Sequence, residues 1–214
     1  MTPVGLEGGV PVLVRTLRNF ERSEAVDDIV LALRPGDQER AEELIASALI
    51  RKVRRIVPGG EERQDSVRIA LSAAVTTGAG VVVVHDGARP FAGPELIGKV
   101  AAAAHESGAA VAAVRPKDTV KTESEPGSLR TPDRSLCWLA QTPQAFRTEL
   151  FVRAMERAVS DGFRATDDSA LVERLGARVV IIEGFYGNIK ITTPEDLEIA
   201  EIFMKSGMTQ STRP

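Results

Sequence analysis

The chain has 214 residues, enough for a single domain over residues 1–214 with a substantial core. Its 27 basic and 30 acidic residues give a net charge of −3, which argues against nucleic acid as a partner, because proteins that bind phosphate backbones usually have a basic excess. The single cysteine, Cys137, excludes an internal disulfide, and no apolar run approaches the roughly 18 residues that a membrane span needs. The N-terminus also lacks a signal-peptide pattern, so we expect a cytoplasmic protein without a membrane partner.

Helical and strand patterns alternate through the first half of the chain. We predict helices over residues 11–22, 37–49, 66–75 and 94–105, and strands over 29–33, 53–57, 81–84 and 109–114. This alternation is typical of βαβ units, so we predict a doubly wound α/β fold with a mostly parallel, Rossmann-like sheet. The strand 81–84 consists of four valines, a pattern typical of a strand buried on both faces.

The alternation breaks at residues 117–138, which have no helical period and contain Pro126-Gly127. We interpret this segment as a two-stranded antiparallel β-arm that turns at this pair. A hairpin with few apolar residues is not stable by itself, so we expect the arm to be a dimerisation element; the alternative is a disordered surface loop.

The chain returns to helices and strands after the arm. We interpret Gln141 to Gln144 as a turn, and predict helices over 148–159 and 168–175 and a strand over 179–182. Thr193 and Pro194 are typical of the N-cap and first position of a last helix, which runs to about Lys205.

The turn after the four valines is the first candidate site. Asp86 and Arg89 follow the strand directly, and in open α/β sheets ligands bind just beyond the carboxyl ends of the strands. The alternative is an ordinary surface ion pair in a turn.

Other candidates lie in loops. Gly60, Glu61 and Ser66 come between a strand and a helix, where glycines allow close approach of a ligand and free N–H groups can bind it; the alternative is an ordinary βα loop. Thr166 precedes two aspartates that either bind a ligand or cap a helix. Lys190 stands in an apolar strand context, where a buried ammonium would need an anionic partner.

Six motifs in order resemble one known family over nearly the whole chain. They are VPGGEERQDSV (57–67), VHDGARPF (84–91), KDTVK (117–121), QTPQAF (141–146), TDDSALVE (166–173) and NIKITTPEDLEIAE (188–201). The family is that of the 2-C-methyl-D-erythritol 4-phosphate cytidylyltransferases of isoprenoid precursor synthesis. The resemblance implies transfer of CMP from CTP to methylerythritol phosphate, with release of pyrophosphate.

The resemblance also implies roles for single residues. Gly60, Glu61, Ser66, Asp86 and Arg89 would surround the cytidine. Thr119 and Thr166 would contact the methylerythritol phosphate, and Lys190 would lie between the phosphates. Arg134 would hold the acceptor phosphate from the other subunit of a homodimer. Mg²⁺ would be carried mainly by the triphosphate, without a set of protein ligands.

The chemistry favours cations over a general base. The attacking oxygen belongs to a phosphate, which is already a fair nucleophile, and the obstacle is to bring two polyanions together. We therefore regard Lys190 and Arg134 as the catalytic residues.

The chain departs from the family at its start. The family begins with a strand and a glycine-rich loop that carries an arginine and then a lysine, whereas Thr2 or Pro3 stands where that lysine would fall. Two explanations are open. Either the start of the natural protein lies upstream, or the chain has lost its main contacts with the triphosphate. We favour the first, because the other motifs are intact. We expect a protein that begins at Met1 to be impaired, since each lost transition-state cation costs ~10²–10³ in turnover.

Two alternative functions remain open. The ribitol 5-phosphate cytidylyltransferases share much of the pattern and differ in the polyol pocket. A non-catalytic dimeric nucleotide-binding protein would keep the nucleoside pocket without turnover.

Overall fold

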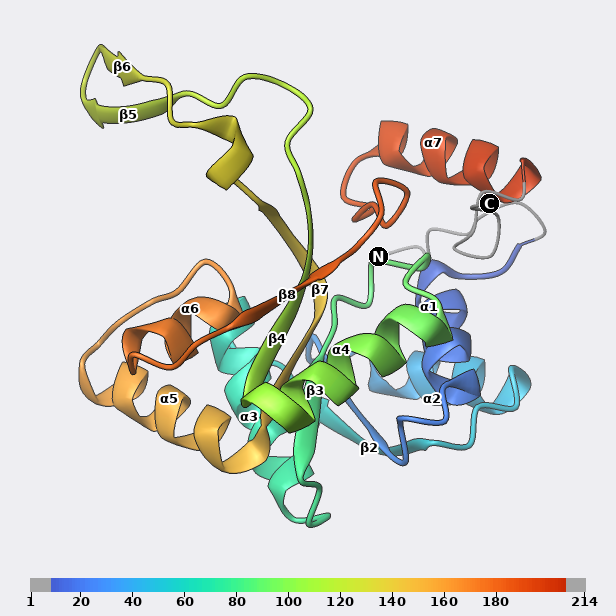
Figure 1. The fold of residues 1–214 in the computed structure, drawn as a ribbon. Coiled ribbons are helices and arrows are strands. Elements are labelled where there is room, and N and C mark those ends of the chain that lie inside the picture. The colour runs from blue at the N-terminus through green and yellow to red at the C-terminus, as the bar shows by residue number, and fades with distance from the viewer. Residues whose placement is uncertain (1–8, 207–214) are drawn as a thin grey trace.

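The computed structural model describes residues 9–206 of the chain (Figure 1). Thr2 and Pro3 lie outside these residues. The helices are α1 (Val12–Arg22), α2 (Gln38–Ser47), α3 (Arg63–Val75), α4 (Pro94–Ser107), α5 (Thr148–Ser160), α6 (Asp168–Arg174) and α7 (Pro194–Lys205), with a 3₁₀ turn, η1, at Arg134–Leu136. The strands are β1 (Ile29–Leu33), β2 (Val53–Pro58), β3 (Val81–Val84), β4 (Ala109–Val114), β5 (Thr122–Glu125), β6 (Ser128–Arg130), β7 (Leu139–Arg147) and β8 (Val180–Glu183).

The main sheet has the strand order β3-β7-β4-β8. β4 and β8 are parallel, whereas β7 is antiparallel to both β3 and β4, so β3, β4 and β8 run in one direction. β1 and β2 form a separate parallel pair. The predicted α/β class is confirmed, but the interpretation of Gln141–Gln144 as a turn is wrong, because these residues lie inside β7 and are buried there. Pro143, which rarely stands inside a strand, misled the prediction.

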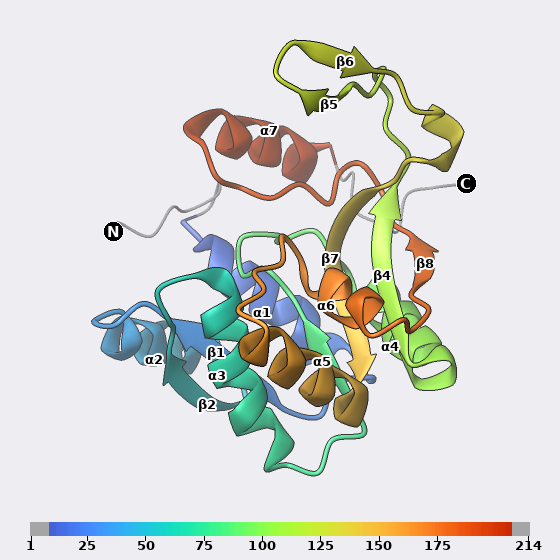
Figure 2. The same cartoon turned by 90° about the vertical axis from the view of Figure 1, so that its left-hand side faces the viewer.

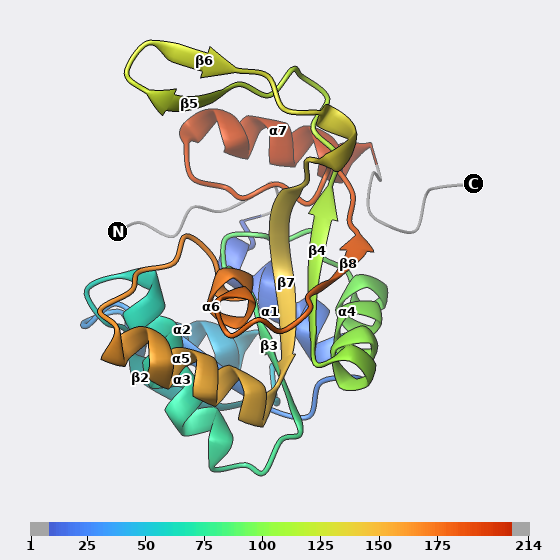
Figure 3. The same cartoon turned by 60° about the vertical axis from the view of Figure 1, so that its left-hand side comes forward.

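Helices cover both faces of the main sheet, as the two turned views show (Figures 2 and 3). On one face, α4 packs Leu96, Val100 and Ala104 against the alanines of β4. On the other face, α5 and α6 enclose a cluster around the stacked rings of Phe146 and Phe151. These two apolar layers confirm the predicted doubly wound arrangement.

The valine strand β3 differs from its prediction. Only Val82 is buried, and the other three valines are half-buried. The physical reason is that β3 is an edge strand of the sheet as described: one edge pairs with β7, and the other lines a cavity of about 650 Å³ between β3 and β1.

The predicted arm is an ordered hairpin that projects from the body of the molecule (Figure 1). Gly127 takes a positive φ of 80° at its turn. The arm joins two neighbouring strands, since Val114 at the end of β4 pairs with Leu139 at the start of β7. Arg115 lies over the ring of Trp138, 3.7 Å from its centroid, and this contact links the two ends of the arm where they leave the sheet.

The last segment confirms one prediction and corrects another. Thr193 and Asp196 form a reciprocal capping box at the start of α7. The segment before it is not a strand, however, and the Lys190 side chain is 41 % exposed. No helix within residues 9–206 is both long and apolar enough to cross a bilayer.

Candidate active site at the Asp86 turn

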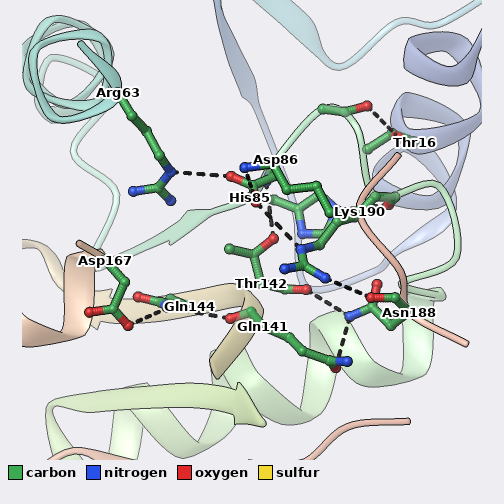
Figure 4. A network of polar contacts seen from close by, with 12 residues as sticks. Thr16, Arg63, His85, Asp86, Gln141, Thr142, Gln144, Asp167, Asn188 and Lys190 are labelled. Atoms are coloured by element: carbon green, nitrogen blue, oxygen red, sulfur yellow. Dashed lines mark hydrogen bonds and ion pairs between the residues drawn. The ribbon is translucent and has the colours of Figure 1, made fainter. Parts of the chain in front are cut away.

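Three cations converge on the carboxylate of Asp86 at the end of β3 (Figure 4). One of its oxygens lies 3.2 Å from Nε of Arg63, and the other lies 3.3 Å from Nζ of Lys190 and 3.4 Å from Nε of Arg89. The three cations come from α3, from the segment before α7 and from the turn itself. Arg63 and Lys190 are each far in sequence from the Asp86 turn, so it is the fold that brings the three cations together.

The cations determine the charge state of Asp86. Burial alone would raise the pKa of this carboxyl group, but Arg63, Lys190 and Arg89 outweigh burial and hold the pKa below its ordinary value. Asp86 therefore stays ionised at neutral pH, and it holds three like charges together that would otherwise repel one another.

Arg63 connects the turn to a second, deeper carboxylate. Its Nη2 donates to Asp168 over 2.7 Å, and the Asp168 side chain is only 1 % exposed. Burial raises the pKa of Asp168 despite this partner. Burial alone would lower the pKa of the Arg63 guanidinium, but the carboxylates of Asp168 and Asp86 outweigh burial and raise it. The cluster thus contains three cations and two carboxylates, and the neighbouring Asp167 adds a third carboxylate that also acts on Asp168.

Backbone contacts fix the shape of the turn. The Asp86 N–H donates to the hydroxyl of Thr142 on β7 over 3.1 Å. Arg89 donates to the carbonyl of Asn188 over 2.7 Å, and the amide of the buried Asn188 donates to the Thr142 carbonyl over 2.9 Å. Because the Ile191 N–H also donates to the Ala88 carbonyl, the Lys190 segment is fastened to the turn on both sides of the lysine.

His85 contacts the turn through its imidazole ring. Its Nε2 lies 3.0 Å from the Arg89 carbonyl, and its ring packs against Phe20 at 4.9 Å between centroids. Burial lowers the pKa of this imidazole to about 4. A neutral ring therefore holds the turn, in agreement with the structural role that its position indicates.

The glycine loop folds back onto the start of α3. The Gly60 N–H donates to the Ser66 hydroxyl over 3.0 Å, and a Cβ on Gly60 would lie 2.3 Å from that of Asp65. Only glycine fits there. The predicted residues Gly60 and Ser66 are thus together, whereas Glu61 is exposed beside them. α3 begins three residues earlier than predicted, which places Ser66 inside the helix.

Of the other predicted residues, two belong to the arm and one comes two residues before Asp168 of the cluster. Arg134 is on η1 of the arm, where it donates to the Lys117 carbonyl over 2.6 Å, and Thr119 is exposed near the base of the arm. Thr166 is exposed just before α6. Of the two readings for the aspartates beside it, capping applies to Asp167, whose carboxylate accepts from the Ala170 N–H.

Sequence reasoning missed Arg63 as a member of the cluster. The predicted start of α3 at Ser66 left Arg63 in a loop. In the structure it occupies the first helical position, where a cation meets the positive end of the helix dipole. Its two carboxylate partners come from distant parts of the chain, so no local pattern identified it.

The described residues do not supply an evident metal centre. Within residues 9–206, no group of three or more histidine, cysteine or acidic side chains is arranged to hold a metal ion. Asp86 and Asp168 are already engaged by cations.

Comparisons with known proteins identify the family of the chain. The family model described as 2-C-methyl-D-erythritol 4-phosphate cytidylyltransferase matches residues 6–206. The chain belongs to this family. A cytidylyltransferase of that name from Geobacillus kaustophilus is 48 % identical over 203 residues, which cover 95 % of this chain and 88 % of the relative. The one from Pelotomaculum thermopropionicum is 49 % identical over 200 residues, covering 92 % and 84 %.

Solved structures of the family have the same fold. The 4-diphosphocytidyl-2C-methyl-D-erythritol synthase from Anaerococcus prevotii superposes with a TM-score of 0.85 at 33 % identity, covering 92 % of this chain and 87 % of that one. The Thermus thermophilus cytidylyltransferase superposes with a TM-score of 0.75 at 34 % identity, covering 92 % and 90 %. Membership of this cytidylyltransferase family therefore rests on sequence and fold together.

Proposed function

We propose that the protein transfers CMP from CTP to 2-C-methyl-D-erythritol 4-phosphate and releases pyrophosphate. The observation that carries the proposal is the cluster of Arg63, Arg89 and Lys190 around Asp86, at the carboxyl edge of the sheet, in a chain of this family. Cations gathered at that edge suit a triphosphate and a second phosphate that must approach each other.

The reaction is a displacement at the α-phosphorus of CTP. An oxygen of the acceptor phosphate forms the new bond, the bond to the β-phosphate breaks, and pyrophosphate leaves with that electron pair. Lys190 is half-exposed and held by Asp86, so its ammonium is free to contact phosphate oxygens on its solvent side. We assign it the stabilisation of charge at the α-phosphate.

The nucleotide and the acceptor occupy different sides of this cluster in our proposal. Gly60, Glu61, Ser66, Asp86 and Arg89 surround the cytidine in this assignment. The hydrogen bond from Gly60 to Ser66 keeps two of these residues together. Thr119 and Thr166 contact the acceptor. Both are exposed, so neither hydroxyl is enclosed by other parts of the chain.

Arg134 acts on the acceptor phosphate of a second subunit in this proposal. It lies on the arm and not in the Asp86 cluster of its own chain, and the strands of the arm are exposed throughout. Leu129, Leu136 and Leu139 on the arm and its base are 64, 79 and 50 % exposed, an apolar surface that a homodimer would cover.

Mg²⁺ enters with CTP rather than on a resident protein site. The acidic groups of the cluster are paired with cations, so they fit a metal poorly, whereas a triphosphate brings its own oxygen ligands. When bound, the ion neutralises charge on the departing pyrophosphate.

A substrate competition tests the proposal. The protein is incubated with CTP, Mg²⁺ and either methylerythritol phosphate or ribitol 5-phosphate, and the CDP-polyol and pyrophosphate are measured. We expect faster turnover of methylerythritol phosphate. The ratio of the two rates is informative even if the absolute rates are low, because a defect in the triphosphate grip lowers both alike.

The other outcomes identify the alternatives. Preference for ribitol 5-phosphate would assign the protein to that activity. CTP binding by calorimetry without any product from either polyol, even after any upstream sequence is restored, would favour a non-catalytic nucleotide-binding protein and contradict the proposal.

A further inference from the structure

Helix α1 carries a face of arginines that the proposed reaction does not use. Arg15, Arg18 and Arg22 recur at intervals of three and four residues, which places them on one side of the helix. The opposite side packs into the body of the molecule through buried residues such as Leu17 and Phe20. The three arginines therefore face outward together, with Arg15 and Arg18 half-buried and Arg22 exposed.

No carboxylate neutralises these three guanidinium groups in the described part of the chain. Within residues 9–206, none of them makes an ion pair or a side-chain hydrogen bond. The single acidic residue of α1, Glu21, accepts instead from the backbone N–H groups of Arg51 and Lys52, over 3.1 and 2.9 Å. Like charges at this spacing destabilise a helix, and a bound anion would remove that repulsion.

The arginines also line a shared hollow. Its volume is about 110 Å³, and Arg15, Arg18, Asn19 and Arg22 form its walls. Asn19 is held in place, because its amide donates to the Pro90 carbonyl over 2.9 Å. Partial burial, followed by the charges of Arg18 and Arg22, lowers the pKa of the Arg15 guanidinium. Arginine remains protonated at neutral pH, so three positive charges face one another around this hollow.

The hollow suits a small oxyanion in size and in chemistry. Its 110 Å³ is several times the about 30 Å³ that a water molecule occupies in the liquid, which leaves room for a phosphate group. Guanidinium groups present a planar fork of N–H donors that matches phosphate oxygens. A neutral ligand would leave the repulsion unchanged, and a carboxylate brings a single negative charge against three positive ones.

We propose that Arg15, Arg18 and Arg22 bind one phosphate dianion, either as inorganic phosphate or as the terminal group of a small phosphate monoester. The hollow shares no residue with the Asp86 cluster, so this site is distinct from the candidate active site. The proposal therefore stands independently of the proposed transfer reaction.

Titration with inorganic phosphate tests the site. Sodium chloride keeps the ionic strength constant, so that general screening of surface charges does not change. The Nε–H signals of the arginine side chains are followed by NMR. We expect the signals of Arg15, Arg18 and Arg22 to shift and to saturate together. Signals that stay in place, or that shift without saturation, would overturn the proposal.

Two variants test the arginines themselves. Arg18→Gln removes the middle charge and should weaken phosphate binding at least tenfold, because a hydrogen bond between charged groups is lost. Arg22→Gln, at a fully exposed position where the fold is not at risk, should weaken it likewise. The matched control is Arg68→Gln, which removes the same charge from an exposed position on α3 and should leave binding unchanged. Equal affinity in all three variants would overturn the proposal.

Two further arms identify the ligand and separate the two sites. Glycerol 3-phosphate replaces phosphate in a second titration: tighter binding would assign the site to a monoester, and weaker binding to the free ion. Binding of neither compound would overturn the proposal. The phosphate-induced shifts on α1 should persist in Lys190→Ala, which removes a cation of the Asp86 cluster. Their loss in that variant would show that they report phosphate bound at that cluster, and would overturn the proposal.

Discussion

Lys190 is held in place at the candidate site and is still accessible to solvent. Its ammonium is held 3.3 Å from a carboxylate, and its side chain is still 41 % exposed. It is therefore positioned without being buried, as a group must be if it is to contact a charged substrate. Arg63, in contrast, is committed to two carboxylates of the protein, and Asp168 behind it is almost fully buried. The cluster thus contains one cation that can contact a substrate, Lys190, and one that holds carboxylates of the protein, Arg63.

The variant Lys190→Ala separates these tasks. We expect turnover relative to the unchanged protein to fall by ~10²–10³, because a cation that stabilises transition-state charge is lost. The free energy of unfolding should change by less than about 0.5 kcal/mol, as for other exposed positions. Steady-state kinetics and urea unfolding measure both quantities. Lys99→Ala, which removes an exposed lysine paired with Glu95, is the control, and unchanged turnover in Lys190→Ala would show that Lys190 is structural only.

Arg63→Met should reduce the free energy of unfolding. The change leaves the carboxylate of Asp168 buried without its cation, and breaking a buried pair costs ~3–5 kcal/mol; since Arg63 is about one third exposed, we expect ~2 kcal/mol. The double variant Arg63→Met with Asp168→Asn should recover part of the loss. Urea unfolding of the unchanged protein, the two single variants and the double variant measures the coupling free energy between Arg63 and Asp168. Additive effects of the two changes would contradict the predicted coupling. Arg68→Met on the same helix is the control.

His85 makes stability depend on pH. Its pKa is about 4 in the folded protein against 6.5 as the ordinary value, so below pH 6.5 the unfolded chain takes up a proton that the folded chain refuses. Stability should fall as the pH drops from about 6.5 to 4, by up to ~3 kcal/mol from this residue. Urea unfolding of the protein and of His85→Phe at several pH values tests this. The free energy of unfolding of His85→Phe should fall less as the pH drops. The same dependence on pH in both proteins would contradict the prediction.

At the scale of elements, the sequence predicted most helices and strands but not β7. Apolar patterns identified α1, β1 and β4 within a few residues, and the arm was identified by its lack of a helical period and its Pro126-Gly127 turn. β7 contains two glutamines, a threonine and a proline that are buried in pairing and hydrogen bonds, so its polar composition concealed a central strand. The contact between Arg63 and Asp168 likewise joins residues 105 positions apart, which no local pattern reveals.

The arm carries its own prediction, which rests on the proposed homodimer. If Arg134 acts on the partner's site, Arg134→Ala and Lys190→Ala proteins should each be weakly active. Mixing them should restore activity, because every hybrid dimer regains one site with both residues, ~25 % of all sites at equal mixing. Turnover of the mixture after subunit exchange is the measurement. No recovery in hybrids whose formation is verified would place Arg134 in its own subunit's site.

At the scale of the whole molecule, the main sheet and the pair of β1 and β2 differ in burial. All residues of β4 are buried, whereas every residue of β1 is half-buried and three residues of β2 are exposed. Regions with few buried contacts open at lower free energy than the core does. The pair of β1 and β2 should therefore be the less stable half of the fold.

Native-state hydrogen exchange measures this difference directly. We expect amides of β1 to exchange at least tenfold faster than those of β4. The exchange of the β1 amides should also depend less on denaturant, since they open locally. The amides of α4, which packs on β4, serve as an internal reference. Equal protection of β1 and β4 would show that the molecule opens as one unit.

The pairing of Val114 with Leu139 has a consequence for engineering. Because β4 and β7 are adjacent and antiparallel, the whole of residues 115–138 is, in topological terms, one long hairpin connection. Its ends meet at a fixed spacing whatever its length, so the connection can be shortened or replaced without rethreading the sheet. This makes the arm the natural graft point of the molecule, where a binding loop or a reporter domain can be inserted while the layers beneath remain as they are.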